Sequence, residues 1–147
     1  MHIMARYPAL IEPGDGGFTV SFRDIPEALT CGDTQEEAQT MASDALLTAM
    51  EFYFEDQRAV PPPSPAQHGE VMVDLPASAY AKVLLLNEIV RQRITQVELS
   101  RRMGVPRQEV ARIVNLGHAT KIDTLAAALR AVGKDLVLGL EDATAPA

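Results

Sequence analysis

Hydrophobic and polar residues alternate near the N-terminus of the chain in a way that is typical of strands. The alternation covers residues 3–11 and 18–22, and the Gly- and Pro-rich stretch between them, residues 13–17, indicates a turn. A shorter run, residues 28–31, predicts a third strand. Because proline cannot donate a ladder hydrogen bond, Pro8 predicts that the first strand lies at an edge of the sheet or carries a bulge.

A helical spacing of apolar residues follows. Thr34 and Glu37 have the sequence of a capping box, in which the threonine side chain caps a helix N-terminus. The apolar stripe after them predicts a helix that reaches Phe54 and covers the sheet; it consists of Ala38, Met41, Ala42, Ala45, Ala49, Met50 and Tyr53. Beyond the proline-rich connector at residues 61–65, alternation at residues 71–75 predicts a fourth strand that returns to the sheet. The first part of the chain is therefore expected to have the order β-β-β-α-β.

The second part of the chain has helical spacing. A strongly apolar helix is predicted over residues 77–93, and Pro76 marks its junction with the first part. A last helix is predicted over residues 122–129 and ends at Gly133. Leucines alternate with other residues over residues 136–140, which indicates a short C-terminal strand. A second copy of the chain would have to provide its partner.

Between these helices the sequence predicts two short ones joined by a tight turn. Thr95 and Glu98 repeat the capping-box pattern and begin a helix that runs to Met103, where Gly104 supplies the left-handed residue that ends it. Pro106 has a fixed φ suited to a first helical turn, and apolar residues then recur at three- and four-residue spacing. Two such helices are typical of a helix-turn-helix, whose second helix enters the major groove of DNA.

Polar residues at particular positions of this motif predict how it would contact DNA. Arg107 and Gln108 open the second helix, where arginine can form two hydrogen bonds with guanine and glutamine two with adenine. Arg112, one turn further on, can reach a base or a phosphate, and Gln96 at the start of the first helix can reach a phosphate. The alternative is an ordinary helical hairpin with solvated arginines. The coincidence of capping box, glycine, proline and basic face favours DNA binding.

Charge is divided unevenly along the chain. The 147 residues carry a formal charge of −7, but residues 1–76 hold three arginines against thirteen Asp and Glu, for −10, whereas residues 77–147 hold ten Lys and Arg against seven, for +3. An acidic surface repels phosphate, so nucleic acid is assigned to the C-terminal part. For the N-terminal part the charge leaves two interpretations open: a basic partner, or acidity that only aids solubility.

Few residues suit a catalytic or metal site. Cys31 is the only cysteine, which excludes an intramolecular disulfide and favours a small buried thiol in a reducing compartment. His2, His68 and His118 have no neighbour at metal-ligand or triad spacing, and the carboxylates are scattered. The sequence contains no signal-peptide pattern and no apolar run of membrane-spanning length. We therefore expect a cytoplasmic protein with no catalytic residue, metal, cofactor or membrane partner.

Several segments of the chain occur together in one known family. They are Gly17-Phe18, Ser21-Phe22, Asp24-Ile25-Pro26-Glu27-Ala28, Thr30, Gly32, Thr34, Glu37-Ala38, Ala45-Leu46, Phe52-Tyr53-Phe54-Glu55-Asp56, Lys82-Val83-Leu84-Leu85-Leu86-Asn87 and Ala119-Thr120-Lys121-Ile122-Asp123. Together with the two short helices they resemble the HicB antitoxin of type II toxin–antitoxin systems, in the branch that carries a helix-turn-helix rather than a ribbon-helix-helix. The resemblance covers nearly the whole chain, and the segment that begins at Asp24 is quite specific to this family.

The resemblance implies an α+β protein in which residues 1–76 form a partial ribonuclease-H-like domain and residues 77–147 form an all-α helix-turn-helix domain for DNA binding and dimerisation. It implies that the first domain lacks nuclease activity and occludes HicA, a small basic toxin that cleaves mRNA, through residues that the resemblance does not assign.

The resemblance also implies that the protein, as a homodimer or higher homo-oligomer, represses its own operon by binding operator double-stranded DNA. The residues that match the DNA-contact positions of the family are Gln96, Arg107, Gln108, Arg112 and Asn115. Pro106 departs from the usual Ser or Thr, where a cap and a phosphate contact would otherwise be expected.

The sequence leaves two other classes of protein as alternatives. A single-component transcriptional regulator would use the N-terminal domain to sense a small ligand and would have no toxic neighbour. A degenerate nuclease would need clustered carboxylates and would cut RNA with Mg²⁺. Both alternatives are weaker than the antitoxin that the resemblance implies, and the scattered carboxylates do not form the cluster that a nuclease needs.

Overall fold

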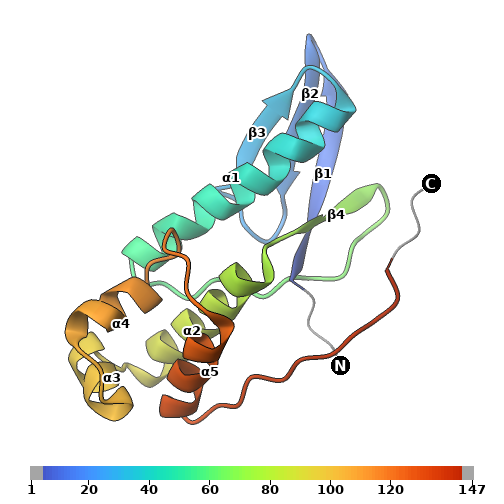
Figure 1. The fold of residues 1–147 in the computed structure, drawn as a ribbon. Coiled ribbons are helices and arrows are strands. Elements are labelled where there is room, and N and C mark those ends of the chain that lie inside the picture. The colour runs from blue at the N-terminus through green and yellow to red at the C-terminus, as the bar shows by residue number, and fades with distance from the viewer. Residues whose placement is uncertain (1–4, 144–147) are drawn as a thin grey trace.

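The computed structural model describes residues 5–143. Within this range the chain forms β1 (Arg6–Gly14), β2 (Gly17–Phe22), β3 (Leu29–Gly32), α1 (Gln35–Glu55), β4 (Glu70–Asp74), α2 (Ala77–Gln92), α3 (Gln96–Met103), α4 (Arg107–Ile113) and α5 (Ile122–Ala131). Figure 1 shows a sheet with α1 along one face, and the remaining helices gathered beyond the far end of α1. The predicted α+β class and the order β-β-β-α-β are confirmed. The predicted start of the first strand at Ile3 lies outside the described residues.

The sheet has the strand order β3-β2-β1-β4, and every neighbouring pair is antiparallel. Strands β1 and β2 form a hairpin whose last pair is Gly14 with Gly17, so the predicted turn contracts to Asp15 and Gly16. Gly16 has a φ of 82°, a left-handed conformation that glycine adopts without steric cost. The turn is confirmed, and both strands extend further into it than the sequence indicated.

The prediction that Pro8 marks an edge strand is wrong, because β1 lies between β2 and β4. The carbonyl of Ala5 accepts a hydrogen bond from Leu75 at 2.8 Å, and hydrogen-bonding groups alternate sides along an antiparallel strand. The nitrogen of Pro8 therefore points away from β4 and toward β2. Pairing with β2 begins only at Ala9, so no carbonyl of β2 lies opposite the nitrogen that lacks a proton.

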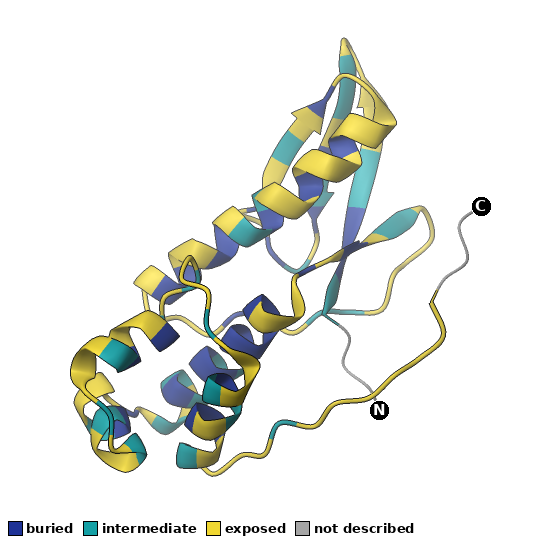
Figure 2. Cartoon of the chain, viewed as in Figure 1, coloured by how far each residue is buried: buried dark blue, intermediate teal, exposed yellow. Residues whose placement is uncertain are grey.

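Helix α1 covers one face of the sheet with a stripe of small and large apolar residues. Its buried side chains are Ala38, Ala42, Leu46, Ala49, Met50, Tyr53 and Phe54, and Figure 2 shows them on one side of the helix. Met41, predicted to belong to the buried stripe, is instead 39% exposed. The close approach depends on Gly32, where an added Cβ would lie 2.5 Å from the backbone nitrogen of Ala38.

Cys31 is exposed, so the prediction of a buried thiol is wrong. The pairs Phe18 with Gly32 and Val20 with Thr30 belong to the helix-covered face of the sheet. Successive residues of a strand point to opposite faces, so Cys31 and its neighbour Leu29 point to the uncovered face. Leu29 is 68% exposed there.

Helix α2 contributes to two hydrophobic clusters on its two sides. Its members of the first cluster, which pack with the sheet and α1, are Tyr80, Val83 and Leu86. Its members of the second cluster, which pack with α3, α4 and α5, are Ala81, Leu85 and Ile89. The predicted domain boundary at Pro76 therefore lies directly before α2, and this helix contributes side chains to both hydrophobic clusters.

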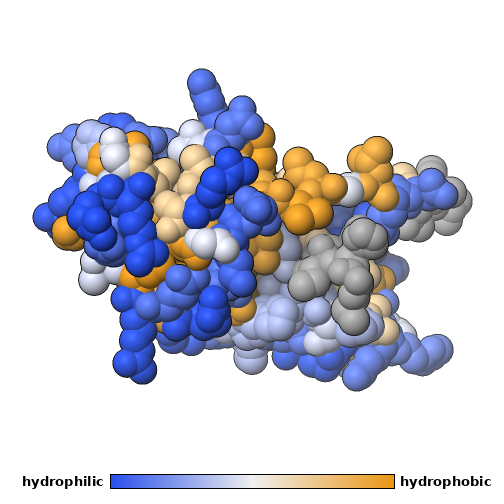
Figure 3. Space-filling view, turned by 90° about the horizontal axis from the view of Figure 1, so that it is seen from below, coloured by the Kyte–Doolittle hydropathy of each residue, from blue (hydrophilic) through white to orange (hydrophobic). Residues whose placement is uncertain are grey.

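The C-terminal segment after α5 forms no strand within the described chain. Val137, Leu138 and Leu140 are exposed, and hydrophobic side chains stand out along this segment in the view from below (Figure 3). The predicted C-terminal strand is thus absent from the single chain. Pairing with a second copy stays a prediction.

Candidate nucleic-acid interface

Helix α3 begins and ends where the sequence indicated. The Thr95 hydroxyl accepts a hydrogen bond from the backbone N–H of Glu98 at 3.1 Å, which caps α3. Gly104 ends the helix with φ 69° and ψ 32°. Three residues, 104–106, separate the two helices, and the predicted turn is confirmed.

The capping box at the start of α3 is only half formed. The carboxylate of Glu98 faces away from the Thr95 cap toward the basic face of α3, where it accepts hydrogen bonds from Arg101 and Arg102. These bonds, that of Arg101 first, hold the pKa of Glu98 below its usual value. The two arginines are thus partly neutralised within their own helix.

Pro106 precedes the first residue of α4 instead of occupying it. Its φ of −64° suits a helix, but its ψ of 153° is extended, and no side chain caps α4. The absence of the usual Ser or Thr at this position therefore leaves the start of α4 without a hydroxyl that could cap the helix or meet a phosphate.

The two helices are held by apolar side chains on their inner sides. Leu99 of α3 and Val110 and Ile113 of α4 are fully buried in the second cluster, together with Leu125 and Leu129 of α5. Because those residues face inward, the polar residues between them face solvent. This packing determines which side of α4 is free to meet a ligand.

The five residues predicted to contact DNA are all exposed: Gln96, Arg107, Gln108, Arg112 and Asn115. Gln96 is the first residue of α3, and Arg107 and Gln108 are the first two of α4. Nη1 of Arg112 lies 3.6 Å from a carboxylate oxygen of Glu109, so this arginine already has a weak partner. Arg107 and Gln108 thus lie at the N-terminus of α4, and Arg112 lies one turn further along.

Asn115 has a structural task as well. Its side-chain oxygen accepts a hydrogen bond from the N–H of Gly117 at 3.0 Å, which closes the turn after α4. Only the amide nitrogen of this side chain is left to donate to a ligand. Asn115 therefore has fewer free hydrogen-bonding groups for DNA than the sequence suggested.

The acidic end of α1 lies beside the part of the predicted DNA-contact surface that Gln96 and Asn115 form. A pocket of about 560 Å³ is lined by Glu51 and Glu55 of α1 on one side and by Gln96 and Asn115 on the other. A phosphate placed in it would approach two carboxylates, which is unfavourable. The start of α4, at Arg107 and Gln108, is therefore the better side for an anionic ligand.

One residue with a role at this surface was not predicted. Lys82 of α2 is buried, and its Nζ donates hydrogen bonds to the carbonyls of Arg112, Asn115 and His118, at 3.2, 2.8 and 2.6 Å. The available signal was a single lysine within an otherwise apolar stretch of the predicted helix. Which backbone it meets depends on the tertiary fold.

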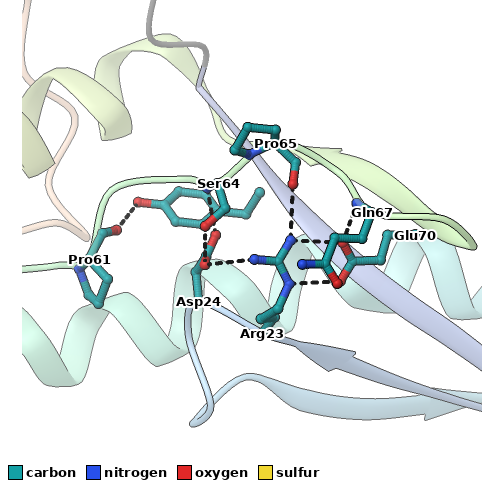
Figure 4. A network of polar contacts seen from close by, with 8 residues as sticks. Arg23, Asp24, Pro61, Ser64, Pro65, Gln67 and Glu70 are labelled. Atoms are coloured by element: carbon teal, nitrogen blue, oxygen red, sulfur yellow. Dashed lines mark hydrogen bonds and ion pairs between the residues drawn. The ribbon is translucent and has the colours of Figure 1, made fainter.

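Several acidic side chains of the first part serve to hold the connector between α1 and β4. Asp24 accepts hydrogen bonds from the backbone N–H and hydroxyl of Ser64, and Glu70 pairs with Arg23 at 2.9 Å (Figure 4). The hydrogen bond from Arg23 holds the pKa of Glu70 below its usual value. In Figure 4 the side chain of Arg23 reaches from the end of β2 to Glu70 and the carbonyl of Pro65. These carboxylates are structural.

The described part of the chain contains neither a cluster of metal ligands nor a helix of membrane-spanning character. Among residues 5–143, no group of three or more His, Cys, Asp or Glu side chains is placed to hold a metal ion. His118 lies next to Thr120 in the loop after α4, and His2 lies outside the described residues. No helix in the same range combines the length and apolar character that a membrane span requires.

Comparison with known proteins identifies close relatives over most of the chain. Antitoxin HicB 1 of Photorhabdus laumondii is 54% identical over 92% of this chain and 87% of its own length. Antitoxin HicB of Escherichia coli K12 is 52% identical over 90% and 97%, and antitoxin HicB of Pseudomonas fluorescens is 35% identical over 96% and 97%.

Residues 6–84 also match the family described as the HicB-like antitoxin of bacterial toxin–antitoxin systems. This range covers the sheet, α1 and the first half of α2. Antitoxins are a non-enzymatic class, so the expectation that the chain is not an enzyme is confirmed. The family match and the relatives together show that the chain belongs to the HicB-like antitoxins of bacterial toxin–antitoxin systems.

Proposed function

We propose that this antitoxin occludes a HicA-type ribonuclease toxin with its N-terminal part and represses its own toxin–antitoxin operon with its C-terminal part. The observation that carries the proposal is the division of charge, −10 for residues 1–76 and +3 for residues 77–147. A basic toxin and a DNA phosphate backbone need surfaces of opposite sign. One chain can serve both partners only if the two surfaces are separate.

The N-terminal part has a fold and a surface suited to binding a basic protein. Its four-stranded antiparallel sheet with one covering helix supports the interpretation as a partial ribonuclease-H-like domain. The outer side of α1 exposes Asp44, Glu51 and Glu55, and Phe52 beside them is 51% exposed. Carboxylates around an exposed aromatic side chain combine electrostatic attraction with apolar contact. Inhibition by occlusion needs only such binding.

The C-terminal part carries the proposed DNA-binding function. A capped α3, a three-residue turn and an α4 that begins with Arg107 and Gln108 are what a helix-turn-helix requires. In that role, Arg107 and Gln108 contact bases, Arg112 contacts a base or a phosphate, and Gln96 and Asn115 contact phosphate at the margin. The operator is double-stranded DNA, and the protein acts in the cytoplasm where both partners occur.

The exposed C-terminal segment supports assembly into a homodimer or higher homo-oligomer. Leu138 is 76% exposed and Leu140 fully exposed, and the backbone around them has no strand partner within the described chain. Antiparallel pairing with the same segment of a second copy would satisfy the backbone and bury these leucines. Two copies would then present two α4 helices to an inverted repeat.

The proposal is tested with the full chain and the product of the short basic reading frame expected beside its gene. Purified toxin is assayed for RNA cleavage with and without an excess of this chain, and the chain is assayed by gel shift on the DNA upstream of its operon. We expect cleavage to stop and the upstream DNA to be bound. Binding of DNA without any toxin inhibition would instead indicate a single-component regulator, and the proposal would be wrong.

A further inference from the structure

Lys82 is the one charged side chain among residues 5–143 that is buried, with 2% of its surface exposed. Its ammonium group lies under the end of α4 and the loop that follows. The three N–H bonds of the ammonium point to three carbonyl oxygens, those of Arg112, Asn115 and His118. The donors and acceptors are therefore matched in number.

Those carbonyls belong to the end of α4 and the loop after it, where backbone acceptors most need a donor. The last carbonyls of a helix have no partner in the next turn, and they lie at the negative end of the helix dipole. In this loop the carbonyls of Arg112 and Asn115 each accept one backbone N–H, at 3.2 and 3.1 Å. Lys82 adds a charged donor to both and links them to His118.

The arrangement costs free energy that an apolar residue would not cost. An ammonium group is expensive to bury, and burial lowers the pKa of Lys82 to about 8. The group still carries its proton at neutral pH, and the three carbonyls favour the charged form. The flanking Ala81 and Val83 are buried in the two hydrophobic clusters, so an apolar side chain of similar length would suit this part of α2.

We propose that Lys82 is the positioning residue of the DNA interface, holding α4 and the loop after it in one orientation relative to α2. The inference rests on the proposed DNA-binding function. Two of the five residues assigned to DNA, Arg112 and Asn115, are held through their own carbonyls. Since α4 has only seven residues, a tilt at its end also displaces Arg107 and Gln108 at its start.

The anchor also connects the two parts of the molecule. Helix α2 packs against the sheet and α1 through Tyr80, Val83 and Leu86, on either side of Lys82 along the helix. Lys82 therefore fixes the orientation of α4 relative to α2, the helix that also packs against the proposed toxin-binding part. The polar contact of Lys82 adds directional precision that apolar packing at Val110 and Ile113 does not provide by itself.

The test compares Lys82→Met, which keeps the length of the side chain and removes its donors, with Lys134→Met, which removes the same charge from an exposed position after α5. Lys82→Gln, which retains one amide donor, serves as a second variant if the methionine variant does not fold. Each full-length variant is measured for toxin inhibition, for affinity to the upstream DNA over a salt series, and for amide hydrogen exchange in residues 112–118.

We expect Lys82→Met to inhibit the toxin as the wild type does and to lose roughly 10- to 100-fold in DNA affinity, as for one lost charged hydrogen bond. Its salt dependence should match that of the wild type, because Lys82 contacts no phosphate, whereas a lost phosphate contact reduces the slope by about one. Amides of residues 112–118 should exchange faster in Lys82→Met, while Lys134→Met should leave them unchanged.

Equal DNA affinity and equal exchange in Lys82→Met and wild type would overturn the positioning role alone. A reduced salt slope would also overturn it, because the lysine would then contact DNA directly. A wild-type chain that binds none of the upstream DNA would overturn the proposed repressor function, and the positioning role with it.

Discussion

The side chain of Asn87 forms two hydrogen bonds with the main chain of Val60. Its Oδ1 accepts from the N–H of Val60 at 2.7 Å, and its Nδ2 donates to the carbonyl of Val60 at 2.9 Å. The side chain of Val60 is itself buried in the first hydrophobic cluster. One amide on α2 thus satisfies the backbone of the connector after α1, and this connector is held against α2 by directional bonds as well as by packing.

Replacement of Asn87 by Ala should therefore destabilise the protein. Two buried backbone groups of Val60 would lose their partners, and we expect the free energy of unfolding to fall by about 1–3 kcal/mol. Urea unfolding followed by circular dichroism measures this change. Gln39→Ala is the control, because Gln39 is an exposed amide on α1. An Asn87→Ala protein as stable as that control would show that the paired bonds contribute nothing.

Glu27 should contribute to the acid sensitivity of the fold. The hydroxyl of Tyr53 donates to Glu27 at 2.7 Å, and this bond, with the Arg58 guanidinium nearby, holds the pKa of Glu27 below its usual value. A carboxyl group whose pKa is lowered by folding stabilises the folded state at pH values above its unfolded-state pKa. This stabilisation is lost as the pH falls through the lowered pKa of the folded state. Stability below about pH 4.5 should thus decline less steeply in Glu27→Gln.

The measurement for Glu27 is urea unfolding between pH 3 and pH 7. Glu141→Gln, in the exposed C-terminal segment, is the control and should follow the wild type over the whole range. If the free energies of unfolding of Glu27→Gln and wild type fall in parallel below pH 4.5, Glu27 does not contribute to the acid sensitivity.

The start of α4 should determine operator affinity. Replacing Arg107 or Gln108 by Ala removes a base contact in the proposed complex and should cost about 1–3 kcal/mol on the operator, while toxin inhibition is retained. Gel shifts and growth rescue separate the two functions. Arg130→Ala, which removes an exposed arginine of α5, controls for loss of charge. Unchanged operator affinity in both variants of α4 would refute the assigned groove contacts.

The C-terminal segment should mediate self-association. Replacing Leu138 with Asp places a charge where two apolar segments would pair, and we expect the full-length chain to sediment as a monomer. Leu29→Asp changes a leucine of similar exposure on the uncovered face of the sheet and should leave the assembly intact. A wild type that is already monomeric at operator-saturating concentration would exclude dimerisation through this segment.

Association with the toxin should slow as salt increases. Exposed charges are screened over a Debye length of about 8–10 Å near physiological ionic strength, whereas a buried apolar interface preserves the dissociation rate. Binding kinetics over a salt series test this expectation. The full chain is used because a fragment of residues 1–76 would lack Tyr80, Val83 and Leu86 of the first core. Equal salt sensitivity of both rates would argue against electrostatic steering.

Local signals in the sequence determined where most elements begin and end. The caps at Thr34 and Thr95 and the left-handed Gly104 act within a few residues of themselves, so their effect can be read from the chain. Alternation and helical spacing also predicted the order β-β-β-α-β and the helices after it. The same pattern placed Arg107 and Gln108 on the exposed start of a short helix.

Tertiary structure alone decided the features that depend on distant partners. Pro8 lies in a central strand because β4 returns from more than 60 residues away to pair with β1, and Cys31 is exposed because only one face of the sheet is covered. Lys82 meets carbonyls 30 to 36 residues away, and spacing cannot encode such a contact, because only packing brings the two segments together.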